Sequence, residues 1–420
     1  MDALCTDWIS PSICTGLRET LPFLSRSAEG PDPLLACGLT LIAGLLVGEL
    51  LYRRFRLPRV VGYVLLGAVL GGIAGNGGRP LIQLVLRPMA DVSLGLLLLE
   101  TGRRIDLGWL RRNRHLGLGC LIEALASFLL LFAFLWMAVG LSPSWAAATA
   151  AIGMAAAPAV VMLTAEESRA EGQVTERMLQ MTAVNCGVSF LLYTLTLSFI
   201  HAESGADWPS VIGHPLWLLC GALLIAWLGA RMILWMTRQV GKGSLHQVFL
   251  LVGSALVATG AARVLGLPVF LTLFLLGICL TAGDRQQTLA YTNLPEGHWP
   301  LAVILFVLAG VSLPWGDFSL IGVIDATALI CLRGMAKFLG AWVGCRDLPA
   351  RQRRLVALGI QPLSATAIFM AMELHATFPE VAGQPLLIPL IATAMMEMIG
   401  PTLSRRAMVA AGETQERRVA

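Results

Sequence analysis

The chain has 420 residues, of which 56% are hydrophobic and only 13% are charged, and its mean hydropathy is +0.75. So little polar surface excludes a soluble globular protein, and we predict an all-α polytopic membrane protein. The formal net charge of +4 follows from the distribution of Lys and Arg in a membrane topology, and no patch for nucleic acid is present.

Apolar segments recur along the whole chain. A transmembrane helix needs about 20 mostly apolar residues, and on this criterion we predict about 13 such helices. They lie at residues 34–52, 58–75, 88–106, 116–141, 145–165, 178–200, 212–237, 246–262, 267–283, 299–314, 320–343, 354–375 and 385–404.

Basic residues predict how the chain crosses the bilayer. Most Lys and Arg fall in the connections after odd-numbered spans, for example 53–59, 103–114 and 346–354. Cytoplasmic loops carry such an excess, so we expect the N-terminus outside and the C-terminus in the cytoplasm, in the inner membrane of a bacterium. Cys5 and Cys14 would then face the oxidising side, either paired or free.

Three pairs of similar segments indicate an internal repeat. "LPRVVGYVLLGAVL" at 57–70 returns as "LPVFLTLFLLGICL" at 267–280, 97–106 resembles 305–314, and 151–161 resembles 357–367. Spans one to six therefore match spans eight to thirteen, and the intervening seventh span inverts the second copy. Inverted repeats are typical of secondary transporters. The expected domains are an extracytoplasmic segment (1–33), the first six-helix repeat (34–203), a linker helix (204–243), the second six-helix repeat (244–406) and a cytoplasmic tail (407–420).

The repeat predicts two discontinuous helices that cross. Spans five and twelve carry Pro158 and Pro362 at matching positions of the repeat. Proline removes a backbone donor and frees the carbonyl four residues earlier, so such a point offers carbonyls and helix ends to an ion. The predicted crossing consists of Ala156, Ala157, Pro158, Gln361 and Pro362. An ordinary proline kink is the alternative at either position.

Charged residues inside predicted spans are costly and indicate function. Arg333 and Lys337 lie four residues apart near the centre of span eleven, and three acids are candidate partners for them: Glu100, Glu123 and Glu397. The two cations either neutralise the negative ends of half-helices or take part in ion or proton coupling. Glu123 and Glu100 lie off the centre of their spans, where a pairing or snorkelling role competes. Asp91, four residues after Arg87, is expected to form a local ion pair.

The chain resembles the monovalent cation/proton antiporter superfamily, which includes Na+/H+ exchangers and Kef-like transporters. The resemblance extends from about residue 34 onward and rests on the order and spacing of five segments. They are "GELLYRRFRLPRVVGYVLLG", "LLLLETGRRIDLGWLRR", "EGQVTERMLQMTAVN", "LRGMAKFLGAW" and "LGIQPLSATAIFMA". The resemblance implies a homodimer in which a core domain with crossed broken helices moves against a dimerisation domain. It also implies exchange of Na+ or K+ for protons without a cofactor.

The sequence departs from the family pattern at the ion site. Family members usually carry Asn-Asp or Asp-Asp in span six, where the Asp holds a proton or a cation in turn, and here the pair is Asn185-Cys186. The broken fifth helix lacks the usual hydroxyl or carboxyl group before Pro158. Met181 replaces the acidic residue of electroneutral relatives. Hard cations prefer oxygen ligands, and a buried thiol stays mostly neutral, so the usual Asp cycle cannot operate at Cys186.

Three functions follow as hypotheses. The first is cation/proton exchange whose coupling acid has moved, with Glu100 as the expected acid. The second is a non-exchanging sensor, regulatory subunit or effector, which needs a protein partner. The third is a carrier of anions or organic solutes, based on Arg333 and Lys337 facing a site without acids. No spacing of nucleophiles or metal ligands indicates an enzyme or a metal site.

Overall fold

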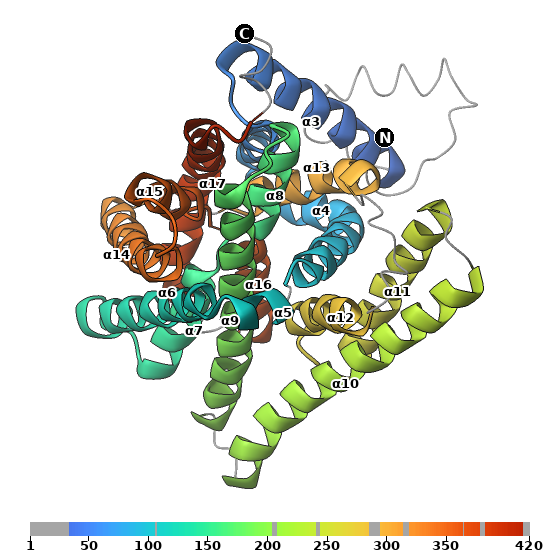
Figure 1. Cartoon of the computed structure of the whole chain (residues 1–420), viewed down its shortest axis with the longest axis vertical. Coiled ribbons are helices and arrows are strands. Elements are labelled where there is room, and N and C mark those ends of the chain that lie inside the picture. Colours follow the sequence, from blue (N-terminus) through green and yellow to red (C-terminus); the bar gives the residue numbers. More distant parts are fainter. Residues whose placement is uncertain are drawn as a thin grey trace, which may run out of the picture.

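The computed structural model describes residues 33–105, 107–203, 208–240, 244–284, 295–313, 319–363, 365–378 and 383–414. Within these ranges the elements are helices, joined by short connections (Figure 1). They are α3 (Pro33–Phe55), α4 (Arg59–Arg103), α5 (Leu107–Arg112), α6 (Arg114–Ala133), the π-helix η1 (Phe134–Ala138), α7 (Pro143–Met154), α8 (Pro158–Glu167), α9 (Gln173–Glu203), α10 (Trp208–Val240), α11 (Ser244–Val264), α12 (Val269–Gly283), α13 (Pro295–Ser312), α14 (Leu320–Gly344), α15 (Ala350–Gly359), α16 (Ala365–Thr377) and α17 (Gly383–Ala411). Cys5 and Cys14 lie outside the described residues.

Six helical segments of the described chain are long and apolar enough to cross a membrane. They are Leu35–Phe55, Arg114–Ala138, Gln173–Ile200, Gly213–Gln239, Gln247–Val264 and Pro385–Ala411. Three shorter apolar helices accompany them, at Arg59–Ala74, Val269–Gly283 and Ala302–Ser312. The chain is thus an integral membrane protein, but the count of about 13 spans is not confirmed.

One element differs from the expected pattern. The predicted spans 58–75 and 88–106 are joined in a single helical element of 45 residues, α4, in which the expected non-helical connection is absent. The stretch between the two predicted spans contains glycines and Pro80, residue types that helices packed among other helices tolerate. The final turns of α4 bury Leu94, Leu97 and Leu98 against the rest of the protein.

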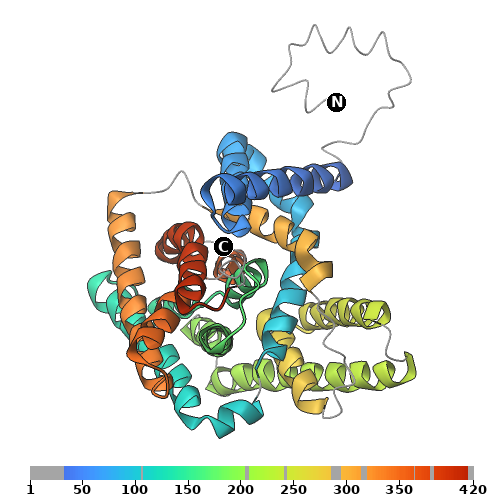
Figure 2. The same ribbon diagram turned by 45° about the horizontal axis from the view of Figure 1, so that its top comes forward.

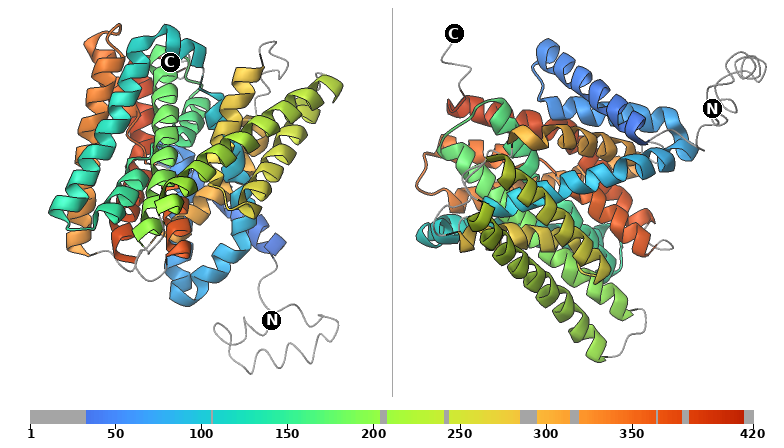
Figure 3. Two further views of the ribbon diagram at one scale, coloured as in Figure 1. Left: turned by 90° about the horizontal axis from the view of Figure 1, so that it is seen from below. Right: turned by 90° about the vertical axis from the view of Figure 1, so that its right-hand side faces the viewer.

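The helices pack in two groups. One group contains α6 to α9 with α14 to α17, and the other contains α3, α4 and α10 to α13. Figure 3 shows α10 and α11 side by side at one edge of the molecule, away from α6 and α14, and Figure 2 shows α9 and α17 surrounded by other helices. Helix α9 belongs to the first group and also contacts α10 and α12 of the second.

Glycines bring α6 and α14 unusually close. A Cβ atom on Gly119 would lie 2.3 Å from the Cα atom of Gly344, and one on Gly340 would lie 2.2 Å from the Cβ atom of Glu123. Small residues let helix backbones approach closely in membrane proteins. This close approach places polar side chains of α6 within reach of those of α14.

Two helices are interrupted where they meet. Helix α7 ends at Met154 and α8 begins at Pro158, while α15 ends at Gly359 and α16 begins at Ala365. The extended residues between these half-helices pair: Ala156 and Leu363 form an isolated antiparallel bridge, and the Ala157 amide donates to the Pro362 carbonyl at 3.1 Å. The paired interruptions leave four helix ends directed at one region.

Candidate functional site

A buried ion pair lies between α6 and α14. Lys337 Nζ is 2.8 Å from Glu123 Oε1, and both side chains have 0% exposed area. Ser127, one turn after Glu123 on α6, donates its hydroxyl to the same Oε1 atom at 3.3 Å. Because each ion alone would cost several kcal/mol to bury, the carboxylate and the ammonium depend on each other.

Asn185 connects this ion pair to the interrupted helices. Its Nδ2 atom donates to both carboxylate oxygens of Glu123 at 3.0 Å, and its Oδ1 atom accepts the Ala156 amide at 2.8 Å. The Asn185 amide is fully buried and uses both its donor side and its acceptor side. One side chain thus connects Glu123 by hydrogen bonds to the backbone between α7 and α8.

Arg333 occupies the interruption itself. Its guanidinium donates to backbone carbonyls from both broken helices, with 1% of the residue exposed. The four acceptors are the carbonyls of Met154 (3.4 Å), Ala155 (3.3 Å), Gln361 (2.5 Å) and Pro362 (3.0 Å). These carbonyls lie at or just beyond the C-terminal ends of α7 and α15, where helix dipoles are negative. Arg333 is thus compensated by backbone groups.

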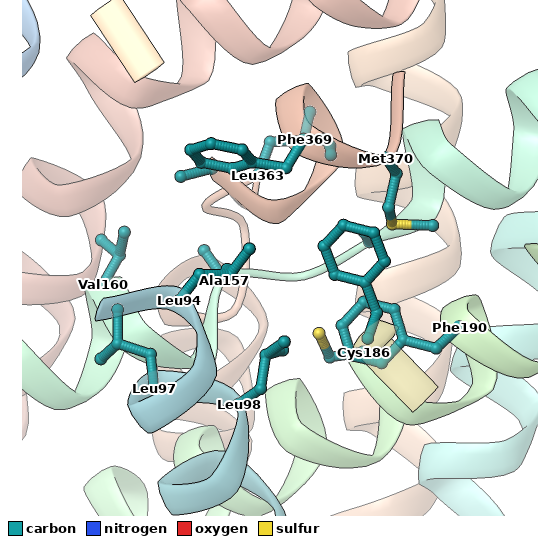
Figure 4. Close-up of a cluster of buried hydrophobic side chains, with 14 of the residues drawn as sticks. Leu94, Leu97, Leu98, Ala157, Val160, Cys186, Phe190, Leu363, Phe369 and Met370 are labelled. Carbon is teal, nitrogen blue, oxygen red and sulfur yellow. The ribbon is translucent and has the colours of Figure 1, made fainter. Parts of the chain in front are cut away.

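Cys186 is not a member of the ion pair, although its thiol hydrogen-bonds to Thr366 of α16 and lies within electrostatic range of Lys337. A step of one residue turns a side chain by about 100° around a helix, so neighbours on α9 face different surroundings. The Cys186 side chain lies among Leu94, Leu98, Ala157 and Phe190 in an apolar cluster (Figure 4). A small cavity borders it, lined mostly by apolar residues of α4, α8, α13 and α16.

The structure separates the other predicted acids from this site. Glu100 accepts a hydrogen bond from Arg103 at 3.2 Å and lies 3.4 Å from Arg104. Both ion pairs are local, because Arg103 is the last residue of α4 and Arg104 follows it. Glu397 on α17 is 1% exposed, and neither carboxylate oxygen has a hydrogen-bond partner among the described residues. Neither acid has a hydrogen bond or ion pair with Lys337 or Arg333 within the described chain.

Three expectations are corrected by these contacts. Glu123 does not snorkel toward a membrane surface, because it is completely buried. Arg333 and Lys337 do not face a site without acids, since Lys337 pairs with Glu123. Asp91 does not pair with Arg87 but with Arg263 of α11, at 2.7 Å.

Sequence reasoning missed the central position of Glu123. Glu123 is one of three candidate partners of Arg333 and Lys337 in the sequence, but its off-centre place in the predicted span favours a snorkelling or helix-pairing role. The informative signal was the combination of Ser127 one turn later with Gly119 on α6 and Gly340 and Gly344 on α14, since small residues mark close helix contacts in membranes. A buried acid at such a contact needs a cation from the neighbouring helix.

The fold has counterparts among solved structures. The structure of the sodium proton antiporter MjNhaP1 from Methanocaldococcus jannaschii at pH 8 matches with a TM-score of 0.69 and 15% sequence identity, over 90% of this chain and 98% of that chain. A structure of the same antiporter from an electron microscopy map matches with a TM-score of 0.63 and 17% identity, over 90% and 94%. Among curated proteins, no sequence matches.

The family assignment rests on the sequence. The family model described as sodium/hydrogen exchanger, transmembrane, matches residues 39–408, which is most of the chain. The match includes both interrupted helices and all residues of the buried ion pair and its partners. The chain belongs to the sodium/hydrogen exchanger family.

Proposed function

We propose that this protein exchanges a monovalent cation, Na+ or K+, for protons, and that Glu123 takes the place of the missing Asp. The supporting observation is the fully buried contact of Lys337 with Glu123, linked by Asn185 to the helix interruption. Glu123 replaces Glu100 as the proposed coupling acid, because the partners of Glu100 are Arg103 and Arg104.

Charge balance links cation binding to proton release. The buried pair of Glu123 and Lys337 is neutral when both groups are ionised. A cation that binds the Glu123 carboxylate must displace the Lys337 ammonium, and the site would then carry an uncompensated positive charge. Burying that charge is costly, so Lys337 loses a proton when the cation enters and regains it when the cation leaves. One carboxylate and one ammonium thus account for competition between one cation and one proton.

The other residues support this exchange in different ways. Asn185 holds the Glu123 carboxylate against the Ala156 amide, which places the site at the interruption. Arg333 neutralises helix ends, a scaffold role that its four carbonyl acceptors favour over coupling. Cys186 stays outside the coupling reaction, in its apolar cluster. Gln361 and Pro362 supply carbonyls to Arg333.

The oligomeric state, the membrane and the orientation of the chain follow from the sequence predictions. We infer a homodimer in the bacterial inner membrane, with the N-terminus outside and the C-terminus in the cytoplasm. The inverted repeats 34–203 and 244–406 each contribute one broken helix, and the two helix groups move against each other during transport. The two groups seen in the structure, with the interruption inside one of them, are compatible with this movement.

Flux measurements on reconstituted protein test the proposal. Proton movement driven by Na+, K+ or Li+ gradients is recorded in proteoliposomes for wild type, Glu123→Gln and Glu100→Gln. We expect Glu123→Gln to lose at least about tenfold in flux, because a lost charge-assisted contact is worth about 1.5 to 3 kcal/mol. Glu100→Gln should retain flux, since Glu100 pairs with arginines outside the site. Wild-type flux in Glu123→Gln would remove Glu123 from the mechanism.

A double variant separates coupling from folding. Glu123→Gln leaves Lys337 buried without its anion, which typically destabilises a protein by about 3 to 5 kcal/mol. The variant Glu123→Gln with Lys337→Met removes both charges and should recover thermal stability without recovering flux. Recovery of both properties would show that the pair is structural only. Glu123→Asp, which keeps the carboxylate, should retain part of the flux.

A non-exchanging sensor or regulatory subunit is the alternative function. One observation favours it: the Glu123 carboxylate already accepts from Lys337, Ser127 and Asn185, so its hydrogen-bonding capacity is largely used. A stable wild-type protein that moves protons with none of the three cations would establish this alternative. Copurification of a second protein would then identify the partner that relays its output.

A further inference from the structure

We propose that a hollow between the two helix groups binds a small zwitterionic organic solute, with one amine and one carboxylate on an apolar body. The hollow has a volume of about 400 Å³. This size falls in the range of small-molecule sites, about 300 to 1,000 Å³, and exceeds what a bare cation or a proton requires. Helices α4, α10, α11 and α12 line it from one group, and α9 and α16 from the other.

Charges of opposite sign remain available in the hollow. Arg87 and Glu373 both line it, and neither forms a direct ion pair with a described residue, although Arg87 and Arg263 lie within electrostatic range of the Glu373 carboxylate. The Oε2 atom of Glu373 is buried without a hydrogen-bond partner, a condition that costs free energy until a donor arrives. Asp91 and Arg263 also line the hollow, but they neutralise each other at 2.7 Å. Among these four residues, the available groups are one carboxylate and one guanidinium.

Apolar side chains form the remaining wall. Leu94, Phe270, Leu273 and Phe369 line the hollow, and Figure 4 shows Leu94 and Phe369 in the apolar cluster around Cys186. A molecule with an apolar body would bury it here, while its amine reaches Glu373 and its carboxylate reaches Arg87. A simple cation leaves Arg87 uncompensated, and a simple anion leaves Glu373 uncompensated. The combination of groups therefore selects a zwitterion.

Three matched probes test this selection. Leucine carries both charges, 3-methylbutylamine lacks its carboxylate, and 4-methylpentanoate lacks its amine. Binding to the purified full chain is measured by calorimetry and by the rise in thermal unfolding temperature. We expect leucine to bind at least about tenfold more tightly than either single-charge probe. Equal binding of all three probes, or tighter binding of a single-charge probe, would overturn the proposal.

Variants locate the site and distinguish two sources of zwitterion. Arg87→Gln and Glu373→Gln should each weaken leucine binding about tenfold or more. Glu49→Gln should not, because Glu49 pairs with Arg53 and Arg59 and does not line the hollow. A phosphatidylethanolamine headgroup presents the same amine and anion. Mass spectrometry of protein purified from lipid shows whether this lipid is retained and is lost in both variants. If the protein neither binds leucine nor retains this lipid, the proposal is overturned, whatever the flux of the Glu123 variants.

Discussion

At the scale of single residues, Arg333 joins the two interrupted helices by hydrogen bonds to carbonyls of both. Its planar guanidinium reaches four carbonyls in two directions, and a lysine ammonium has only three donors at one point. Arg333→Lys should therefore leave carbonyls unsatisfied and destabilise the protein by about 1 to 3 kcal/mol. Thermal unfolding in detergent measures the loss. Arg231→Lys, at an exposed position of α10, is the control and should change the unfolding temperature little.

Asn185 and Cys186 are neighbours in sequence but should behave differently in transport. Asn185→Ala removes the link between Glu123 and the Ala156 amide, so we expect flux to fall about tenfold or more. Cys186→Ala removes a thiol that contacts Thr366 and the apolar cluster but does not bond to Glu123, so it should retain flux in the same proteoliposome assay. A large loss of flux in Cys186→Ala with normal stability would return the thiol to the ion site.

These two residues also show what the sequence reveals at this scale. The polar pair in an apolar helix indicated where the site lies, because an amide in a membrane span needs partners. The residue types could not reveal which neighbour faces Glu123, since this depends on the rotation of α9 against α6. The acid itself was underestimated for the same reason: burial of Glu123 results from the packing of two other helices.

At the scale of elements, the contact of α6 with α14 sets the geometry of the ion pair. A methyl group on Gly119 would lie 2.3 Å from the backbone of α14, and backbone atoms cannot move aside easily. Gly119→Ala should destabilise the protein by about 1 to 3 kcal/mol through overpacking and should reduce flux by separating Glu123 from Lys337. Gly117→Ala is the matched control on the same helix, because its nearest neighbour would lie at 3.6 Å. Equal unfolding temperatures of the two variants would contradict this account.

The elements differ in how well their sequences predict them. Pro158 and Pro362 mark both interruptions, but the loss of a backbone donor does not by itself end a helix, since Pro215, Pro389 and Pro401 lie inside continuous helices. The continuous helix α4 does not follow, because neighbouring helices decide whether glycine and proline end a helix within a membrane protein. The close approach at Gly119 and Gly340 needs both partner helices and is invisible in either sequence segment alone.

At the scale of the whole molecule, the two helix groups are joined by polar contacts at one end. These contacts are Arg59 with Glu167, Arg104 with Glu166, and Arg405 with the Arg56 carbonyl. They involve the connections that are rich in Lys and Arg and that the sequence assigns to the cytoplasm. The hollow lined by Arg87 and Arg263 lies toward the opposite end in this topology. A further contact between the groups, Ser198 of α9 with His214 of α10 at 3.2 Å, lies beside the hollow.

Arg59 allows a comparison of contacts within and between the groups. It lies 2.9 Å from Glu49 of its own group and 3.4 Å from Glu167 of the other, whose side chain is 2% exposed. If Glu167 holds the groups together, Glu167→Gln should increase backbone hydrogen exchange over α8, by about fivefold for a loss of about 1 kcal/mol. Glu49→Gln removes the other partner of the same arginine and should leave exchange in α8 unchanged, because this contact does not connect the groups. Faster exchange in both variants would mean that Arg59 acts through α4 and that the groups are held together elsewhere.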